Sequence, residues 1–339
     1  MTLRLAVVAA TSLSLAFAAC SSEIADDDIG EPASGASSTP EGPWSFTDGS
    51  GEVVELDEVP TRIIAHAAEA AALMSYGIRP VGIYGDEPVT TDPNLHGLDL
   101  AGIEILGEEW GSIDVAKAST LSPDLIVADW WPAEKAHSGF EDGVKAKSKK
   151  LADLAPVVGA TQGDSILDLA QGYEDLAASL GADVESSQGA EDKAAFEEAR
   201  DAFVAAMEEK DFTALAVSPA SDLLYVANPA YAPELQDFER WGLDIIEPDS
   251  PDPAFPYWEN LSWENADKYQ PDVLMFDNRS FAADQKTVKS QPTWTSIRAA
   301  EADQVVEWPG FWLHTYGHFA TALDQLREEL SDLDDSIGD

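Results

Sequence analysis

Short apolar segments alternate with helical segments along most of this chain, and that alternation restricts its fold more than any other feature. The apolar runs at residues 60–65 and 122–128 have the length of buried strands. Segments with helical periodicity lie between such runs, for example at residues 69–76 and 145–154. Buried strands that are separated by helices form mostly parallel sheets. The sequence therefore predicts an α/β protein.

One helical segment, residues 165–180, separates two blocks of this kind. Ser165 and Asp168 form a capping-box pattern at its start, and Gly181 is a natural stop. We predict two Rossmann-like lobes with mostly parallel sheets, joined by this single long helix, with a ligand cleft between them. The predicted divisions are a signal peptide (1–19), a disordered tether (20–43), an N-terminal lobe (44–163), the connecting helix (164–181), a C-terminal lobe (182–330) and an acidic tail (331–339).

The chain is strongly acidic, with 64 Asp and Glu against 19 Lys and Arg and a net charge of -45. Such a field repels phosphate backbones, so nucleic acid is not an expected partner. It also disfavours highly anionic ligands unless a local basic group compensates. We interpret the excess charge as a solvated acidic surface.

The first twenty residues have the pattern of an export signal, with a basic start, a short apolar run and small residues before Cys20. The sequence Ala18-Ala19-Cys20 resembles a bacterial lipobox, although Phe17 stands where leucine is usual. Cys20 is the one cysteine of the chain, so no internal disulfide can form. We predict lipidation at Cys20 and a location on the extracytoplasmic face of the cell membrane. The alternative is a secretory signal that is cut after Ala19.

Aromatic side chains recur where the predicted strands end, which is where open α/β sheets bind ligands. Their flat apolar faces and polar tips suit a large ligand that is partly apolar. Packing under a loop is the alternative for each of them. Arg279 is the one basic residue directly at a strand end, placed for an oxygen-rich or anionic group or for a surface ion pair. The candidate ligand-binding residues are His66, Trp110, Trp130, Trp131, Tyr231, Tyr257, Trp258, Arg279 and Trp312.

His314 and His318 are four residues apart and would share a helix face, which is a spacing that metal sites use. With His66 they form a candidate zinc or manganese site. Gly317 interrupts the pair, however, and no carboxylate cluster stands nearby in sequence. We therefore expect no metal site and no cofactor.

An enzymatic alternative rests on Gly163-Asp164-Ser165, which resembles the nucleophile block of one lipase and esterase family. That family also has an Asp-x-x-His pair, which this sequence lacks, and a serine without a histidine is a poor nucleophile. The helix cap explains Ser165 equally well. The sequence contains no phosphate-binding loop, no dinucleotide fingerprint and no Gly-x-Ser-x-Gly. We expect a binding protein, with a hydrolase using Ser165 as the alternative.

The order of short motifs over residues 50–330 resembles the substrate-binding proteins of iron-siderophore, haem and vitamin B12 ABC importers. The motifs that carry this resemblance are residues 59–64, 77–83, 121–127, 261–265, 270–276 and 292–300.

The resemblance implies two rigid lobes that dock onto an ABC permease, which works with its ATPase. Members of the family typically use one glutamate on each lobe for docking, and Glu264 matches the second-lobe motif. The first-lobe position falls on Ala116, so Asp114 is the candidate there. We expect a monomer.

Three ligand classes remain for this family. A ferric hydroxamate siderophore is neutral or cationic and suits an aromatic site in an acidic protein, so we favour this iron chelate. Catecholate complexes carry several negative charges and would need more basic residues. Haem would need an axial ligand, for which His66 or Tyr231 is available. A corrinoid would lie between tryptophan faces.

Overall fold

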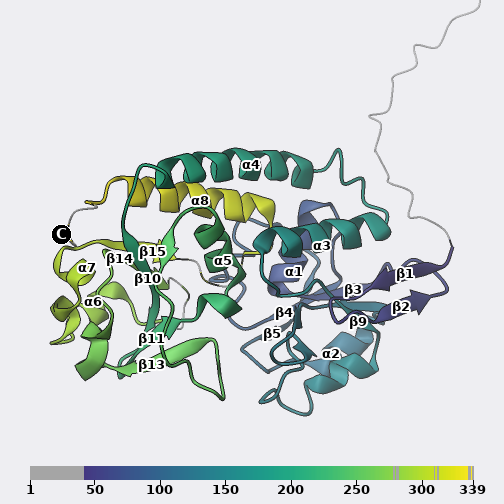
Figure 1. Cartoon of the computed structure of the whole chain (residues 1–339). Coiled ribbons are helices and arrows are strands. Elements are labelled where there is room, and N and C mark those ends of the chain that lie inside the picture. Colours follow the sequence, from purple (N-terminus) through teal and green to yellow (C-terminus); the bar gives the residue numbers. More distant parts are fainter. Residues whose placement is uncertain are drawn as a thin grey trace, which may run out of the picture. The chain divides into compact units, whose positions relative to one another are not determined.

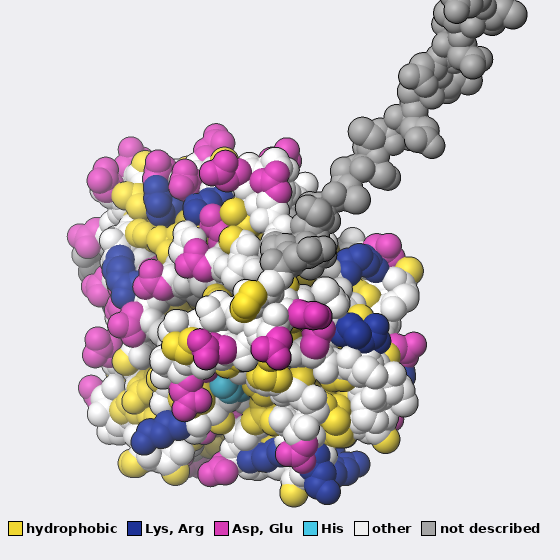
Figure 2. All heavy atoms as spheres, turned by 90° about the vertical axis from the view of Figure 1, so that its right-hand side faces the viewer, with side chains coloured by type: hydrophobic (Ala, Val, Ile, Leu, Met, Phe, Trp, Pro, Cys, Tyr) yellow, Lys and Arg dark blue, Asp and Glu magenta, His cyan; other side chains and the backbone are white. Residues whose placement is uncertain are grey.

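A computed structural model describes residues 42–277, 279, 282–308, 310, 313–334 and 337. The predicted signal peptide, Cys20 and Trp312 lie outside the described residues. Among the described helices, none is both long enough and apolar enough to span a membrane. Acidic side chains are spread over the face of the protein that Figure 2 shows.

The described chain begins with an antiparallel hairpin formed by β1 (Trp44–Thr47) and β2 (Val53–Leu56). Asp48 opens the turn, since the backbone N–H of Gly51 donates to the Asp48 carbonyl at 2.8 Å. Trp44 is buried and Val53 is exposed, so the hairpin places one face against the body of the protein. The sequence predicts this hairpin from its two short strand patterns and the turn pair Asp48-Gly49, and the structure confirms it.

The first sheet has the strand order β5-β4-β3-β6-β9, and all of its neighbouring strands are parallel. The glycines at residues 107 and 111 predict a loop between them, but Gly107 lies within β5, which pairs with β4. In Figure 1, α1 and α2 cover opposite faces of this sheet. The elements of this first lobe are β3 (Ile63–His66), α1 (Ala67–Ser75), β4 (Gly82–Gly85), β5 (Glu104–Glu108), α2 (Val115–Thr120), β6 (Leu125–Val127), the ribbon β7 (Trp130–Trp131) and β8 (Ala136–His137), the 3-10 helix η1 (Lys149–Asp153) and β9 (Val157–Val158).

The second sheet has the order β13-β11-β10-β14-β15, with β12 paired to β10. Strands β10, β12, β14 and β15 are parallel, whereas β11 and β13 run antiparallel to their neighbours. The elements of this second lobe are β10 (Thr213–Pro219), β11 (Leu223–Ala227), η2 (Pro229–Tyr231), α5 (Pro233–Arg240), β12 (Asp244–Ile245), β13 (Trp258–Ser262), η3 (Trp263–Lys268), β14 (Val273–Asp277), α6 (Gln285–Val288), η4 (Trp294–Ser296), α7 (Arg298–Glu301), β15 (Val305–Trp308) and α8 (Tyr316–Ser331).

Two helices, α3 (Ile166–Ser179) and α4 (Gln188–Met207), lie between the sheets in sequence. As predicted, Ser165 caps α3, and its hydroxyl accepts the Leu167 N–H at 3.1 Å. Gly172 lets α3 approach the sheet closely, because an added Cβ would lie 2.7 Å from the Ala160 Cβ. The body of α3 packs against α1 and β1, whereas α4 packs along α8 of the second lobe (Figure 1).

The hydrophobic core continues from one lobe into the other. One cluster of buried residues includes Ala65 of β3, Leu169 of α3, Phe196 of α4 and Val273 of β14. The outer faces of the two sheets have separate clusters, with Ile64 in one and Leu215 in the other. Shared packing of this kind resists separation of the lobes, because opening would expose close-packed apolar surface to water.

Candidate ligand-binding site

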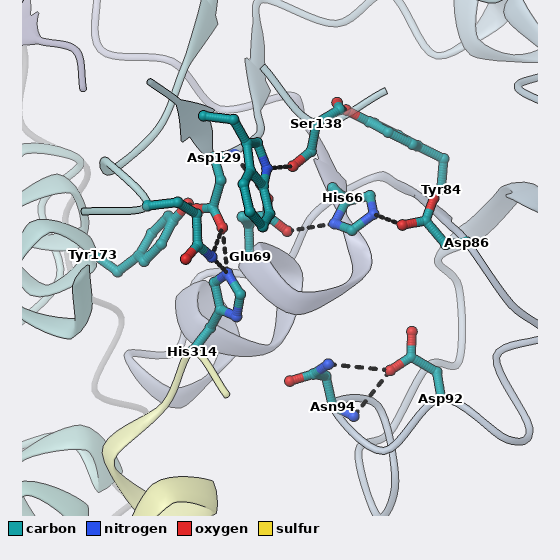
Figure 3. Close-up of polar contacts among 12 residues, drawn as sticks. His66, Glu69, Tyr84, Asp86, Asp92, Asn94, Asp129, Ser138, Tyr173 and His314 are labelled. Atoms are coloured by element: carbon teal, nitrogen blue, oxygen red, sulfur yellow. Dashed lines mark hydrogen bonds and ion pairs between the residues drawn. The ribbon is translucent and has the colours of Figure 1, made fainter. Parts of the chain in front are cut away.

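Three parallel strands of the first sheet end at the same edge, where they place polar side chains together. The last residue of β3 is His66, and it pairs in register with Tyr84 of β4. The imidazole lies between two carboxylates, with Nδ1 at 2.7 Å from Glu69 and Nε2 at 3.4 Å from Asp86 (Figure 3). Burial alone would lower the pKa of His66, but the charges of Glu69 and Asp86 raise it well above its usual value.

A chain of contacts leads from this edge to the second lobe. The hydroxyl of Tyr84 donates to the Ser138 carbonyl at 2.8 Å, and the Trp131 indole N–H donates to the Ser138 hydroxyl at 2.9 Å. The ring of Trp131 packs edge-on against Tyr257 of the second lobe, with 6.1 Å between the ring centres. The ring centres of Tyr257 and Tyr231 are 5.3 Å apart. We call Trp131, Tyr231 and Tyr257 the aromatic junction.

The aromatic junction is only partly covered and has acidic neighbours. Trp131 and Tyr231 are half-buried. Burial raises the pKa of Tyr257, and the nearby carboxylates of Glu134 and Glu141 raise it further. Burial also raises the pKa of Glu141, to which the charge of Asp86 contributes. An acidic aromatic surface favours a neutral or cationic ligand.

Arg279 lies against other aromatic residues in the second lobe. It is 5% exposed and forms a bidentate ion pair with Asp277. Its Nε donates to Oδ1 at 2.9 Å and its Nη2 donates to Oδ2 at 2.7 Å. Its guanidinium lies 5.8 Å from the ring centre of Trp258 and 5.9 Å from that of Trp308. This arrangement matches the ion-pair alternative that the sequence left open, with the pair buried rather than at the surface.

The structure separates the other predicted residues. Trp110 follows β5, is 46% exposed and covers Gly143, where an added Cβ would lie 2.8 Å from the ring. Trp130 packs edge-on against His137 at 5.1 Å. Tyr257 and Trp258 were expected to follow a strand, but Trp258 is instead the first residue of β13.

A second group of polar residues is fully buried between the lobes (Figure 3). Asp129 follows β6, and its carboxylate accepts hydrogen bonds from the Tyr173 hydroxyl, the Gln162 amide and the His314 imidazole. Its backbone N–H donates to Glu69 at 2.8 Å. We call these five residues the buried polar cluster.

Sequence reasoning missed most of the buried polar cluster. Glu69 carries a usable signal, since it is the one charged residue in an alanine-rich apolar helix. From the sequence, His314 is a candidate only together with His318 and His66, not with the carboxylates of this cluster. The two do not form a pair on one helix face, because α8 begins after His314.

Ser165 has the contacts of a helix cap. Besides accepting the Leu167 N–H, its hydroxyl donates to Asp237 at 3.1 Å, and the Ile166 N–H donates to the same carboxylate at 2.8 Å. Asp237 belongs to α5, so the start of α3 also contacts the second lobe.

The two predicted docking residues are both exposed. Glu264 lies in η3 of the second lobe. Asp114 caps α2, where its carboxylate accepts the Lys117 N–H at 3.0 Å. Asp114 also lines a surface hollow of about 700 Å³, and Glu108 and Glu109 line it too.

The chain is similar in sequence and structure to known binding proteins. Residues 138–310, about half of the chain, match the sequence profile described as "Periplasmic binding protein". The crystal structure of DesE, a ferric-siderophore receptor protein from Streptomyces coelicolor, is 32% identical, with a TM-score of 0.77. That match covers 86% of this chain and 99% of DesE. No curated protein matches in sequence.

More distant solved structures share the fold. The siderophore periplasmic binding protein from the fuscachelin gene cluster of Thermobifida fusca is 21% identical, with a TM-score of 0.57, and the match covers 81% of this chain and 97% of that one. The haem-binding protein HmuT is 17% identical, with a TM-score of 0.62, and the match covers 90% and 95%.

Two α/β lobes that bring aromatic and titratable side chains together fit a solute-binding protein, and the proteins of the family that the chain matches are substrate-binding transport proteins, not enzymes. The chain belongs to the periplasmic binding protein family, in the class that contains siderophore and haem receptors. Proteins of this family are extracytoplasmic and work with ABC transporters.

Proposed function

We propose that this protein is the receptor of an ABC importer and that it captures a ferric siderophore of the hydroxamate type. The observation that carries the proposal is the 32% identity to a ferric-siderophore receptor over nearly the whole of that protein. The aromatic junction supports it, because Trp131 and Tyr257 come from different lobes and a ligand that touches both rings would join them.

The charge around the aromatic junction supports the hydroxamate type. The carboxylates of Glu134 and Glu141 are close enough to Tyr257 to raise its pKa, and the positive charge of Arg279 is already paired with Asp277. A catecholate complex would bring several negative charges next to these carboxylates, at a cost that a neutral or cationic hydroxamate complex avoids. His66 lies between Glu69 and Asp86, an arrangement that does not suit an axial haem ligand.

The ligand class is tested by titrating the purified protein and following tryptophan fluorescence. The ligands are ferrioxamine B, ferric enterobactin, haemin and cyanocobalamin. We expect ferrioxamine B to quench the fluorescence with the highest affinity. Tighter binding of haemin or cyanocobalamin would reject the siderophore, and tighter binding of ferric enterobactin would reject the hydroxamate type.

The binding surface is tested with two tryptophan variants. Trp131→Ala removes the ring that contacts Tyr257, and we expect it to weaken ferrioxamine binding at least about tenfold. Trp110→Ala is the matched control, because that ring covers Gly143. An equal loss in both variants would extend the site to Trp110, and no loss in Trp131→Ala would place the ligand elsewhere.

We also propose that Glu264 and Asp114 dock the receptor onto its permease, with Glu108 and Glu109 adding to the acidic surface beside Asp114. Both proposed docking residues are exposed, as a docking role requires. Glu264→Lys is expected to reduce uptake of ferrioxamine by cells and to leave its affinity for the purified protein unchanged. A parallel loss of affinity would contradict a docking role.

The proposed anchor is a lipid on Cys20, followed by the tether that ends before β1. Cys20→Ser should release the protein from membranes into the soluble fraction, as measured by cell fractionation. Retention of the variant on membranes would reject lipidation.

A further inference from the structure

We propose that Glu69, Asp129 and His314 form a binding site for a divalent transition-metal ion that joins the two lobes, with Zn²⁺ as the best fit. One nitrogen or oxygen atom from each of these residues lies within 4.8 Å of those of the other two. Glu69 comes from α1, Asp129 follows β6, and His314 precedes α8 of the second lobe. An ion held by all three would therefore bind atoms from both lobes.

The three residues supply the kinds of donor atom that divalent transition-metal ions bind in proteins. One imidazole nitrogen with carboxylate oxygens suits Zn²⁺, and by the usual order of affinities Mn²⁺ would bind the same atoms more weakly. Two further side chains contact Asp129, Tyr173 through its hydroxyl oxygen and Gln162 through its amide nitrogen, and the amide of Gln162 also carries an oxygen. The group therefore offers more donors than the minimum of three.

Burial and charge also favour a cation. Glu69 is fully buried, and Asp129 and His314 are 1% and 2% exposed. Two carboxylates held together away from water need compensating positive charge. In the ion-free arrangement, His66 contacts Glu69 and the imidazole of His314 donates a proton to Asp129, and each imidazole supplies part of that charge. A divalent ion would take the place of that proton, which passes to solvent, and would bring twice the charge.

Gln162 gives a second, independent indication of a ligand. Its side chain is 7% exposed, and its amide nitrogen lies 2.8 Å from Asp129 and 3.1 Å from the imidazole of His314. Its amide oxygen has no hydrogen-bond partner among the described residues. Rotating the side-chain amide of Gln162 by half a turn would direct this buried oxygen toward His314 and Asp129. An ion bound there could then be coordinated by this oxygen.

Residues around the donors would hold them in place. His66 Nδ1 lies 2.7 Å from one oxygen of Glu69, and the backbone N–H of Asp129 donates to the other at 2.8 Å. Each oxygen of Glu69 therefore keeps a lone pair for an ion. Hydrogen bonds of this kind orient metal ligands and raise affinity.

The test is a titration of Zn²⁺ alone into the purified full chain after removal of metal with EDTA. Isothermal calorimetry is run in buffer containing excess Mg²⁺, which occupies weak carboxylate sites on the acidic surface. We expect one tight equivalent of Zn²⁺ and a higher melting temperature. His314→Ala should weaken binding at least about 100-fold, whereas the control His318→Ala should bind like the unaltered protein.

A second variant covers the case in which His314→Ala does not fold. Glu69→Gln keeps the shape of the side chain and removes one anionic ligand, so it should weaken Zn²⁺ binding at least about tenfold. Circular dichroism establishes that each variant is folded. The absence of a tight equivalent in the unaltered protein, or equally tight binding in Glu69→Gln, would overturn the proposal. Siderophore binding does not enter these measurements, so they are independent of the proposed function.

Discussion

Two contacts between the lobes start two residues apart in the chain and have opposite chemistry. Asp129 reaches His314 through a buried hydrogen bond between charged groups, whereas Trp131 meets Tyr257 through its ring. Asp129 and His314 are 1% and 2% exposed, whereas Trp131 is half-buried. The ionic contact is enclosed and suited to fixing the lobes, while the aromatic junction leaves parts of Trp131 and Tyr231 exposed, as the proposed ligand site requires.

The largest expected effect comes from breaking the ionic contact. Asp129→Ala leaves His314, Tyr173 and Gln162 without their shared acceptor in the interior. Removing one partner from a buried charged network costs about 3–5 kcal/mol. Urea denaturation of the metal-free protein measures this loss. The control is Asp164→Ala, an exposed aspartate for which we expect a change within about 0.5 kcal/mol. Similar values for both variants would show that the buried contact does not stabilise the fold.

A somewhat smaller effect is expected within the second lobe. Arg279→Ala leaves Asp277 buried without its cation, and we expect a loss of about 3 kcal/mol. The double variant Asp277→Ala/Arg279→Ala should lose less than the sum of the single variants, because neither charge remains unpaired. Denaturation of all three proteins measures the coupling. Additive losses would mean that the pair does not act as a unit.

The stability of the second lobe should also depend on pH. Glu234 follows Tyr231 by three residues, and burial raises its pKa to about 7, an effect that Arg279 and Trp308 only partly offset. The folded state therefore binds a proton that the unfolded chain releases near its ordinary pKa of 4.5. The contribution of Glu234 to the free energy of unfolding is complete below pH 4.5 and decreases between pH 4.5 and about 7. Above about pH 7 it no longer changes with pH.

Glu234→Gln isolates that contribution, because glutamine keeps the shape of the side chain and cannot ionise. We expect the variant to be more stable than the unaltered protein by about 1–3 kcal/mol at pH 8 and no more stable at pH 4.5. Urea denaturation at both values measures the difference. An equal effect at the two pH values would assign it to something other than ionisation.

The smallest effect on stability is expected at the aromatic junction. Trp131→Ala removes a half-buried ring and the hydrogen bond to Ser138, so the free energy of unfolding should fall by about 1 kcal/mol. The same variant should lose at least about tenfold in ferrioxamine affinity. If instead stability fell as much as in Asp129→Ala, the two contacts would not differ in role.

Much of the fold could be predicted from local pattern. The hairpin at Trp44, the capped helix α3 and the strands β3, β6 and β14 are visible as apolar runs with turn or cap residues. The strands β5 and β13 were missed because polar residues interrupt them, with Glu104 and Glu108 at the ends of β5 and Glu259 within β13. Such strands are recognisable only through the neighbours with which they pair.

The candidate site could be predicted in part. The position of His66 follows from the rule that parallel strands end at a common edge, and the structure places it there beside Tyr84 and Asp86. The buried polar cluster could not be found in this way. Asp129 lies 60 residues from Glu69, which the first sheet brings close to it, and 185 from His314, whose approach depends on how the lobes pack. The pairing of Arg279 with Asp277 spans two residues, but its burial depends on Trp258 and Trp308.

The hydrophobic cluster that runs from Ala65 to Val273 has a consequence for transport. In the proposed receptor, a wide closing movement on ligand binding would disrupt the hydrophobic packing that the two lobes share. We therefore expect the lobes to keep nearly the same arrangement in the loaded and the empty protein. We expect the permease to distinguish loaded from empty receptor by the exposed face of the captured chelate itself. On this basis, small-angle X-ray scattering with and without ferrioxamine B should give the same radius of gyration.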